Sequence, residues 1–210
     1  MTEQTSAEAD KSSASVAREL NHRVRNMLQI VMGLCNQTLR QSEDLRQFEN
    51  LFLGRVQALA RVYEVVQRNG WTRVSVHELL ESIVSRVLAA DRFQLEGEKS
   101  HLAADAATGF GLVIHELAEG ARQRGAGAHE GKLSVRWEVV RDAGANANHL
   151  TLHWQERTAS DRDPIVASPV YERLQRQLRH ELNGTLAHES APGSLHIKLE
   201  IPLTRAQAGH

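Results

Sequence analysis

The feature that most constrains this chain is a repeat of apolar residues between Arg18 and Leu39. The repeat advances by alternating steps of four and three residues, through Leu20, Val24, Met27, Val31, Leu34 and Thr38. This spacing is typical of the seam along which a long helix packs in a bundle or coiled coil. We therefore expect one long helix from about Ser15 to Gln41, packed against other helices along this seam.

A second long helix is predicted after a short turn at residues 42–44. Its apolar side ends at Asn69-Gly70, a pair typical of helix C-termini, and consists of Leu45, Phe48, Phe52, Leu59, Val62 and Val66. Two long helices joined by a short turn form a hairpin. A lone hairpin leaves much of its apolar face in water, so we expect residues 15–70 to pair with a second copy as a four-helix bundle. The polar residues 1–14 are expected to be a disordered leader.

From Trp71 onward the pattern changes to helices mixed with short strands. We expect helices at 76–88, 103–124 and 171–182, with strands at 93–97, 133–140, 150–156, 185–189 and 195–202. Helices on one face of a mostly antiparallel sheet make an α+β sandwich, which we place at residues 71–203, with a polar tail at 204–210.

Composition narrows the class of protein. The 25 basic and 26 acidic residues nearly cancel, which argues against wholesale binding to nucleic acid or to an anionic membrane. The single cysteine, Cys35, has no internal partner for a disulfide, as suits a reducing compartment. No apolar run reaches the roughly 18 residues that cross a bilayer, and no signal peptide is recognisable, so a cytoplasmic location is expected.

His22 is predicted to lie on the side of the first helix that faces away from the seam. With Val24 at an a position of the heptad, His22 falls at f, in a polar stripe with Arg18, Glu19, Asn26 and Gln29. A histidine that points outward from a rigid helix is accessible to a macromolecular partner. The alternative interpretation is an ordinary solvated histidine on a helix surface.

Several motifs together resemble the HWE branch of the histidine kinases. They are ELNHRVRN at 19–26, FENLFLGRVQALARVYEVV at 48–66, Trp71, HEL at 115–117 and Trp154-Gln155-Glu156. The resemblance covers about residues 16–203 and implies a dimerising hairpin followed by a GHKL-type ATP-binding domain. It implies that His22 is the phospho-accepting histidine and that the partner is the receiver domain of a response regulator. We expect Glu19 and Asn26 to assist His22, and Arg18, Arg23, Arg25 and Gln29 to contact the partner.

The second domain departs from the family pattern at the ATP site. His115, Glu116, Trp154 and Glu156 are retained, but Gly120 replaces the asparagine that would hold Mg²⁺. The family's lysine and tyrosine positions hold Gln123 and Arg124, and two glycine-rich segments are replaced by residues 157–159 and 168–170. We expect this domain to have kept its fold and lost ATP, with no metal or cofactor of its own. In that case His115, Trp154 and Glu156 serve packing.

Three functions remain open on the sequence alone. The favoured one is a histidine phosphotransferase or receiver phosphatase, because a neutral imidazole is a good nucleophile toward an aspartyl phosphate and the receiver supplies its own Mg²⁺. The second is an active histidine kinase that binds ATP in an altered way. The third is a non-catalytic dimeric adaptor that sequesters a receiver protein.

Overall fold

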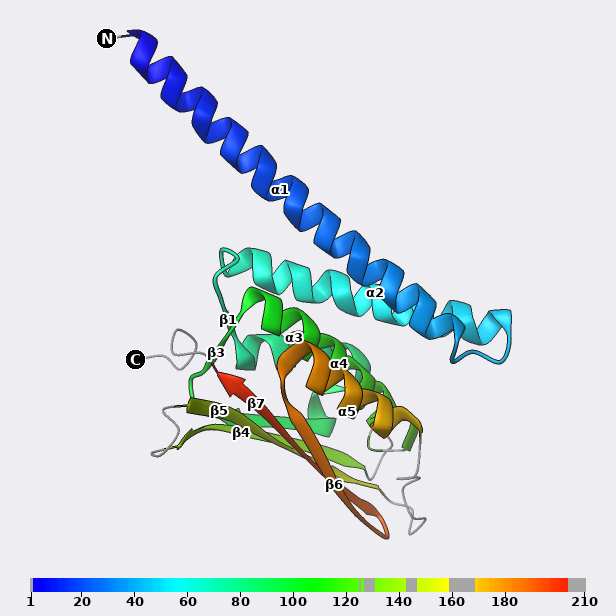
Figure 1. Cartoon of the computed structure of the whole chain (residues 1–210). Coiled ribbons are helices and arrows are strands. Elements are labelled where there is room, and N and C mark those ends of the chain that lie inside the picture. The colour runs from blue at the N-terminus through cyan, green and yellow to red at the C-terminus, as the bar shows by residue number, and fades with distance from the viewer. Residues whose placement is uncertain (1, 125, 127–130, 143–146, 159–168, 204–210) are drawn as a thin grey trace. The chain divides into compact units, whose positions relative to one another are not determined.

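The computed structural model describes residues 2–124, 126, 131–142, 147–158 and 169–203 (Figure 1). The side chains of residues 2–17 and of Glu19 lie outside that description. The contacts divide the chain into two compact units, Met1–Val56 and Gln57–His210.

The first unit contains helix α1, Thr2–Leu39, and the first half of helix α2, Leu45–Arg68. The expected hairpin elements are therefore present, with the turn at residues 42–44. The start of α1 differs from our expectation, because residues 2–14 are helical rather than a disordered leader. Residues 2–17 include neither glycine nor proline, and alanine, glutamate and lysine are good helix formers, so the helix extends beyond its apolar seam toward the N-terminus.

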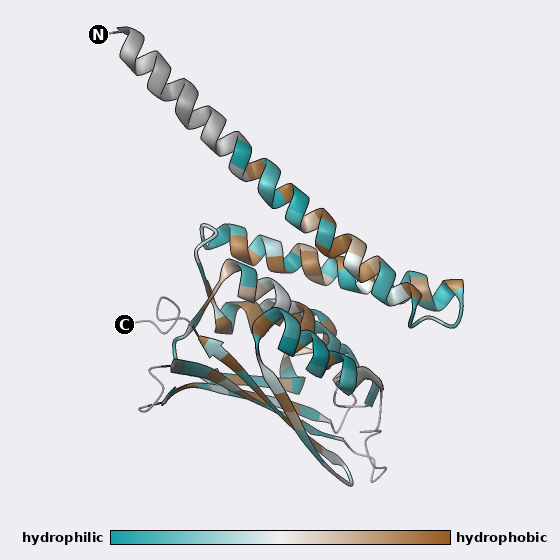
Figure 2. Ribbon diagram, in the orientation of Figure 1, coloured by the Kyte–Doolittle hydropathy of each residue, from teal (hydrophilic) through white to brown (hydrophobic). Residues whose placement is uncertain are grey.

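The predicted seam of α1 is covered at one end only. Leu34 and Thr38 are buried, Met27 and Val31 are half-buried, and Leu20 is 61% exposed. Figure 2 shows hydrophobic residues alternating with hydrophilic ones along the described part of α1, and the large apolar side chains exposed there are Leu20, Val24, Leu28, Met32 and Leu39. Within a single chain, much of the apolar surface of α1 thus faces solvent.

A buried arginine joins the two helices of the first unit near their turn. The guanidinium of Arg55 donates from Nη1 to Thr38 Oγ1 at 2.7 Å and from Nη2 to Gln41 Oε1 at 2.9 Å. The Thr38 hydroxyl donates in turn to the Leu34 carbonyl oxygen at 2.6 Å. Thr38 therefore takes part in the hairpin through its hydroxyl group, whereas the heptad pattern had counted it among the apolar seam residues.

The second unit is built on a five-stranded sheet with the strand order β2-β4-β5-β7-β6. Strand β2 pairs in parallel with β4, and the remaining neighbours are antiparallel. The strands are β2 Phe93–Gly97, β4 Lys132–Asp142, β5 Ala147–Arg157, β6 Thr185–Ala191 and β7 Ser194–Leu203. The sequence did not predict a small second sheet, formed by β1 Arg73–Ser75 and β3 His101–Ala103, because three-residue strands are too short to show an alternation.

Helices α3 Val76–Val87, α4 Ala104–Arg124 and α5 Pro169–Leu182 lie on one face of the five-stranded sheet (Figure 1). A short 3₁₀ turn, Ala90–Arg92, precedes β2. Inward-facing residues of β4, β5 and β7 alternate with polar ones and form a single core with the apolar sides of the helices. Asn183, at the end of α5, has a φ of 50°, as expected for a residue that closes a helix. The predicted α+β sandwich is confirmed.

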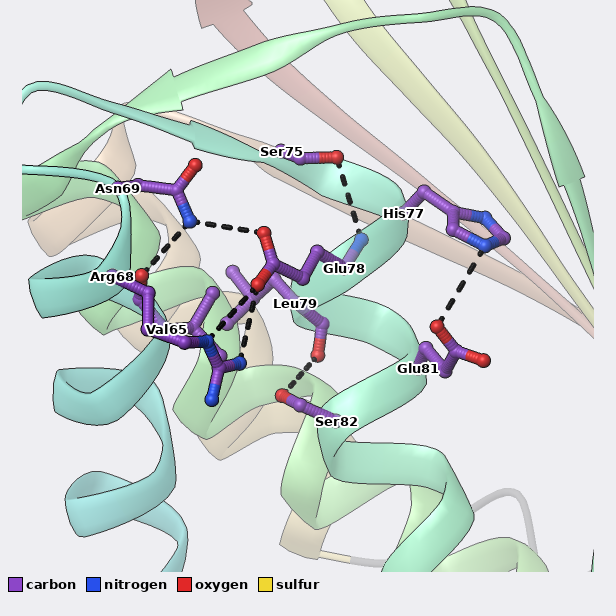
Figure 3. Close-up of polar contacts among 9 residues, drawn as sticks. All are labelled: Val65, Arg68, Asn69, Ser75, His77, Glu78, Leu79, Glu81 and Ser82. Carbon is purple, nitrogen blue, oxygen red and sulfur yellow. Dashed lines mark hydrogen bonds and ion pairs between the residues drawn. The ribbon is translucent and has the colours of Figure 1, made fainter.

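The C-terminal half of α2 belongs to the second unit. Val62, Val65 and Val66 are buried in the same core as the helices and the sheet. Figure 3 shows how the end of α2 is held: Asn69 Nδ2 donates to Glu78 Oε2 at 2.9 Å and to the Val65 carbonyl oxygen at 2.9 Å. Arg68 Nη2 donates to Glu78 Oε1 at 3.1 Å. The contact boundary at residues 56–57 thus lies within α2, whereas the functional limits 15–70 and 71–203 stay predictions.

No helix in the described part of the chain combines the length and the apolar character that crossing a membrane requires.

Candidate functional site

His22 lies exposed on α1, one helical turn before Asn26. The Asn26 side-chain nitrogen lies 3.4 Å from His22 Nδ1. Because an amide group can turn over, Asn26 can donate to a neutral Nδ1 or accept from a protonated one. In either arrangement Nε2 of His22 is not the nitrogen that Asn26 contacts, and it faces away from this contact.

The other predicted residues of this stripe are distributed unevenly. Arg18, Arg25 and Gln29 are exposed on α1, as a partner-binding surface requires, whereas Arg23 is half-buried. The side chain of Glu19 lies outside the described residues, so its expected role beside His22 stays a prediction. The polar stripe therefore consists, where it is described, of His22, Asn26 and their exposed neighbours.

The predicted ATP-site residues lie on α4 and β5. His115 and Glu116 are in the middle of α4, and Gly120 follows one turn later. Trp154 and Glu156 are two residues apart on β5, so the alternation of the strand puts both on its core side, where both are buried. Trp154 Nε1 donates to Glu156 Oε1 at 2.8 Å. The structure therefore brings Trp154 and Glu156 into direct contact.

A residue outside our candidate set, Arg124, completes this cluster. From the last turn of α4 it donates from Nε to Glu156 Oε2 at 2.7 Å and from Nη2 to Glu156 Oε1 at 2.5 Å. Its guanidinium carbon lies 5.9 Å from the centroid of the Tyr171 ring. Burial disfavours a charged arginine here, but the hydrogen bonds and the negative charge of Glu156 outweigh it and raise the pKa of Arg124.

Gly120 gives Arg124 the space that it occupies. A Cβ atom added at Gly120 would lie 2.6 Å from Arg124 Nη1, closer than real atoms approach. The guanidinium therefore lies against the backbone at the position where the family pattern has a metal-holding asparagine. The sequence shows the four-residue spacing of Gly120 and Arg124 on one helix face, but not the partner on β5.

Other charged residues of α4 are also paired. Glu116 accepts a hydrogen bond from Arg173 of α5 at 2.8 Å, and Arg122 pairs with Glu119 at the surface.

Tyr171, at the start of α5, is buried, and burial raises the pKa of its hydroxyl to about 12 even though Arg124 acts in the opposite sense.

The replaced glycine-rich segments are described only in part. The backbone N–H of Thr158 donates to the carbonyl oxygen of Gly193 at 2.9 Å, so it is engaged with the β6–β7 turn. Ala159 and Ser168, and the side chains of Pro169 and Val170, lie outside the described residues, and their expected effect on nucleotide binding stays a prediction.

A histidine pair lies on the outer face of the sheet, where the sequence showed no pattern. His153 Nδ1 and His196 Nε2 are 3.1 Å apart, and their rings are within 10° of parallel with centroids 5.3 Å apart. These values fit two nearly coplanar rings joined edge to edge by a hydrogen bond. His153 also lines a hollow of about 430 Å³ with Glu96, Arg136 and Glu138. In the described residues, no three His, Cys, Asp or Glu side chains gather as a metal site would require.

The chain thus combines a helical hairpin that carries an exposed histidine with an α+β sandwich. Among solved structures, the chain resembles the blue-light activated histidine kinase of Erythrobacter litoralis EL346, with a TM-score of 0.66 and 17% identity over 88% of this chain and 60% of that one. The histidine kinase domain of the same protein gives a TM-score of 0.52 with 16% identity, over 74% of this chain and 76% of that one. Both similarities concern the fold, which is that of GHKL catalytic domains.

The relationship extends to sequence families. The family model of the HWE histidine kinases matches residues 19–99. The chain is 28% identical to the blue-light-activated histidine kinase of Brucella ovis and 30% identical to that of Brucella anthropi, in each case over 97% of this chain. It spans 42% of the length of these relatives. The resemblance to the HWE histidine kinases is thereby confirmed.

Proposed function

We propose that this chain acts in two-component signalling as a histidine phosphotransferase or phosphatase for the receiver domain of a response regulator. His22 is its functional residue, and its C-terminal domain does not bind ATP. The observation that carries this proposal is the pair of His22 and Asn26, exposed together on α1 with 3.4 Å between the Asn26 amide nitrogen and His22 Nδ1.

This arrangement suits phosphoryl transfer with an aspartyl phosphate. If Asn26 accepts from a protonated Nδ1, the lone pair of a neutral imidazole is on Nε2, the nitrogen that faces the approaching phosphoryl group. Transfer forms the Nε2–P bond and breaks the bond between phosphorus and the aspartate oxygen, which leaves the receiver as a carboxylate. In such transfers positioning provides most of the rate enhancement, and the receiver brings its own Mg²⁺.

A phosphatase uses the same surface differently. Asn26 would hold a water molecule in line with the aspartyl phosphate, and hydrolysis would release inorganic phosphate without a stable phosphohistidine. Arg18, Arg25 and Gln29, which are exposed on the same helix, offer hydrogen-bond donors to the receiver.

The proposed loss of ATP rests on three features of the C-terminal domain. Gly120 has no side chain to hold Mg²⁺, Glu156 is already neutralised by Arg124, and the Thr158 N–H is engaged with Gly193. A nucleotide would have to displace these contacts. If the domain lacks ATP, it acts as a scaffold for the hairpin.

We further propose that the protein is a homodimer of the cytoplasm. The apolar side chains of α1 support the dimer, because Val24 is 44% and Met32 58% exposed in a single chain. Burying such side chains against a second copy contributes about 1.5–3 kcal/mol for each one that becomes fully covered.

An active HWE histidine kinase is the second candidate. It is favoured by the sequence similarity to the Brucella proteins, which are named blue-light-activated histidine kinases. In that case Mg-ATP would bind the C-terminal domain and phosphorylate His22, and the phosphoryl group would pass to the receiver.

The deciding experiment mixes the purified protein with a receiver domain that carries labelled aspartyl phosphate. A transferase acquires the label on His22, and the His22→Ala variant does not. A phosphatase releases labelled inorganic phosphate. Labelling from ATP instead of from the receiver would favour the kinase, and receiver binding with neither transfer nor release would favour the adaptor.

A further inference from the structure

The carboxylate of Glu156 needs a counter-charge. Its side chain is 1% exposed, and an ionised carboxylate is stable in such a place only if it is paired and hydrogen-bonded. Where the structure is described, the side-chain donors to Glu156 are Trp154, through its indole N–H, and Arg124, through two N–H groups. Arg124 is the cation of this set.

Arg124 is held on three sides. The two parallel hydrogen bonds to Glu156 fix the plane of the guanidinium, the Tyr171 ring lies beside it, and the backbone of Gly120 lies against Nη1. A planar fork of donors that faces a carboxylate is the strongest geometry available to such a pair. A Cβ atom at position 120 would require Nη1 to shift from its present place, so the position of the guanidinium depends on Gly120.

We propose that Arg124 is an internal ligand of this domain, which occupies the place between Gly120 and Glu156 and provides the counter-charge that a bound molecule would otherwise supply. The proposal deepens the proposed loss of ATP and rests on it, because the place is free for Arg124 only if no nucleotide holds it. The diffusible molecules that fit the same place are small planar cations with two parallel N–H groups, such as guanidinium.

The proposal predicts a site that opens when Arg124 is shortened. In Arg124→Ala the Glu156 carboxylate is left with Trp154 as its donor, and the melting temperature should fall roughly 6 °C or more below that of a matched control. Arg122→Ala is this control, because Arg122 is an arginine of the same helix turn whose ion pair with Glu119 is exposed.

Millimolar guanidinium chloride, well below its denaturing range, is then the probe. It should raise the melting temperature of Arg124→Ala in a dose-dependent way, whereas equal sodium chloride should not. The melting temperatures of the wild type and of Arg122→Ala should not rise, because in both proteins Arg124 still occupies the place beside Glu156. An Arg124→Ala variant as stable as Arg122→Ala, or one with equal responses to the two salts, would overturn the proposal.

Gly120→Ala tests the same proposal should Arg124→Ala fail to fold. Alanine is the better helix former, so helix propensity alone would raise the melting temperature. If Arg124 is an internal ligand, the added Cβ displaces it and the melting temperature falls. A rise in the melting temperature of Gly120→Ala contradicts the proposal.

Calorimetry of the wild type with Mg-ATP tests the loss of ATP separately. Binding of Mg-ATP would overturn that part of the proposed function, whereas the guanidinium response concerns Arg124 itself.

Discussion

The carboxylate of Glu78 accepts hydrogen bonds from Asn69 at 2.9 Å and from Arg68, which links the last turn of α2 to the first turn of α3 (Figure 3). Between these two helices the chain passes through Gly70 and Trp71, both at positive φ. Trp71 packs edge-on against the Tyr63 ring, with centroids 5.5 Å apart. These hydrogen bonds and this aromatic contact hold the connection between α2 and α3, which we call the α2–α3 joint.

Glu78→Ala should weaken this joint. The variant loses both acceptor oxygens, while the Ser75 hydroxyl still accepts from the Glu78 backbone N–H. We therefore expect the free energy of unfolding to fall by about 1 kcal/mol. Denaturant unfolding measures the change. Glu81→Ala is the matched control on the same helix, since its ion pair with His77 is exposed and long, at 3.9 Å. Equal stabilities of the two variants would mean that Glu78 contributes nothing to the joint.

Gly111→Ala should destabilise the protein even though alanine favours helices. A Cβ at Gly111 would lie 2.4 Å from Cγ2 of Val62, whose branched side chain has few rotamers to escape into. Overpacking of this kind costs about 1–3 kcal/mol, more than the roughly 1 kcal/mol that alanine gains by propensity. Val62→Ala should relieve the clash, so the double variant should be more stable than the two separate effects add up to. Simple additivity in a double-mutant cycle would refute the contact.

Val24→Asp should dissociate the proposed dimer and leave the chain folded. Val24 is exposed in a single chain, so a charge there is harmless to the monomer but is desolvated in an apolar dimer interface. Light scattering at micromolar concentration should give a dimer for the wild type and for Asn36→Asp, a control at an exposed position of the same helix. A monomeric wild type would remove the dimer from the proposal.

Asn26→Ala separates the two proposed activities. If Asn26 positions a water molecule, its loss should slow release of phosphate from the receiver by roughly 10²-fold, the effect typical of a lost catalytic group. His22→Ala would then have the smaller effect. If the protein is a transferase, the order reverses, and His22→Ala abolishes uptake of the label. Unchanged release and transfer in both variants would leave the polar stripe as a docking surface for an adaptor.

The stability of the protein should fall between about pH 10 and pH 12 through Tyr171. Burial raises the pKa of this tyrosine to about 12 in the folded protein, while in the unfolded chain it is near 10. Between these values the unfolded state releases a proton that the folded state retains, so rising pH favours unfolding. Tyr171→Phe cannot ionise and should show a shallower decline. Denaturant unfolding at each pH measures the stability of both proteins. Equal losses of stability with pH in the two proteins would speak against a buried, protonated Tyr171.

Most of the architecture could be predicted because it follows from local patterns. The steps of four and three along α1, the alternation along β4, β5 and β7, and the Asn-Gly pairs at helix ends are properties of neighbouring residues. The same patterns placed His22 on an exposed helix face and Asn26 one turn away. The extension of α1 to Thr2 was missed because polar residues give no periodic signal, although their helix propensity is good.

By itself, then, the sequence determined the two long helices, the α+β sandwich, the exposed His22 and the family resemblance. The tertiary structure alone decided which charges meet: Arg124 with Glu156, Arg173 with Glu116, and Arg68 and Asn69 with Glu78. It also decided that Val62, Val65 and Val66 at the end of α2 pack in the core of the second unit. The physical reason is distance along the chain: a helical or strand period fixes which face a side chain occupies, whereas the partner of a buried charge is set by how separate elements pack.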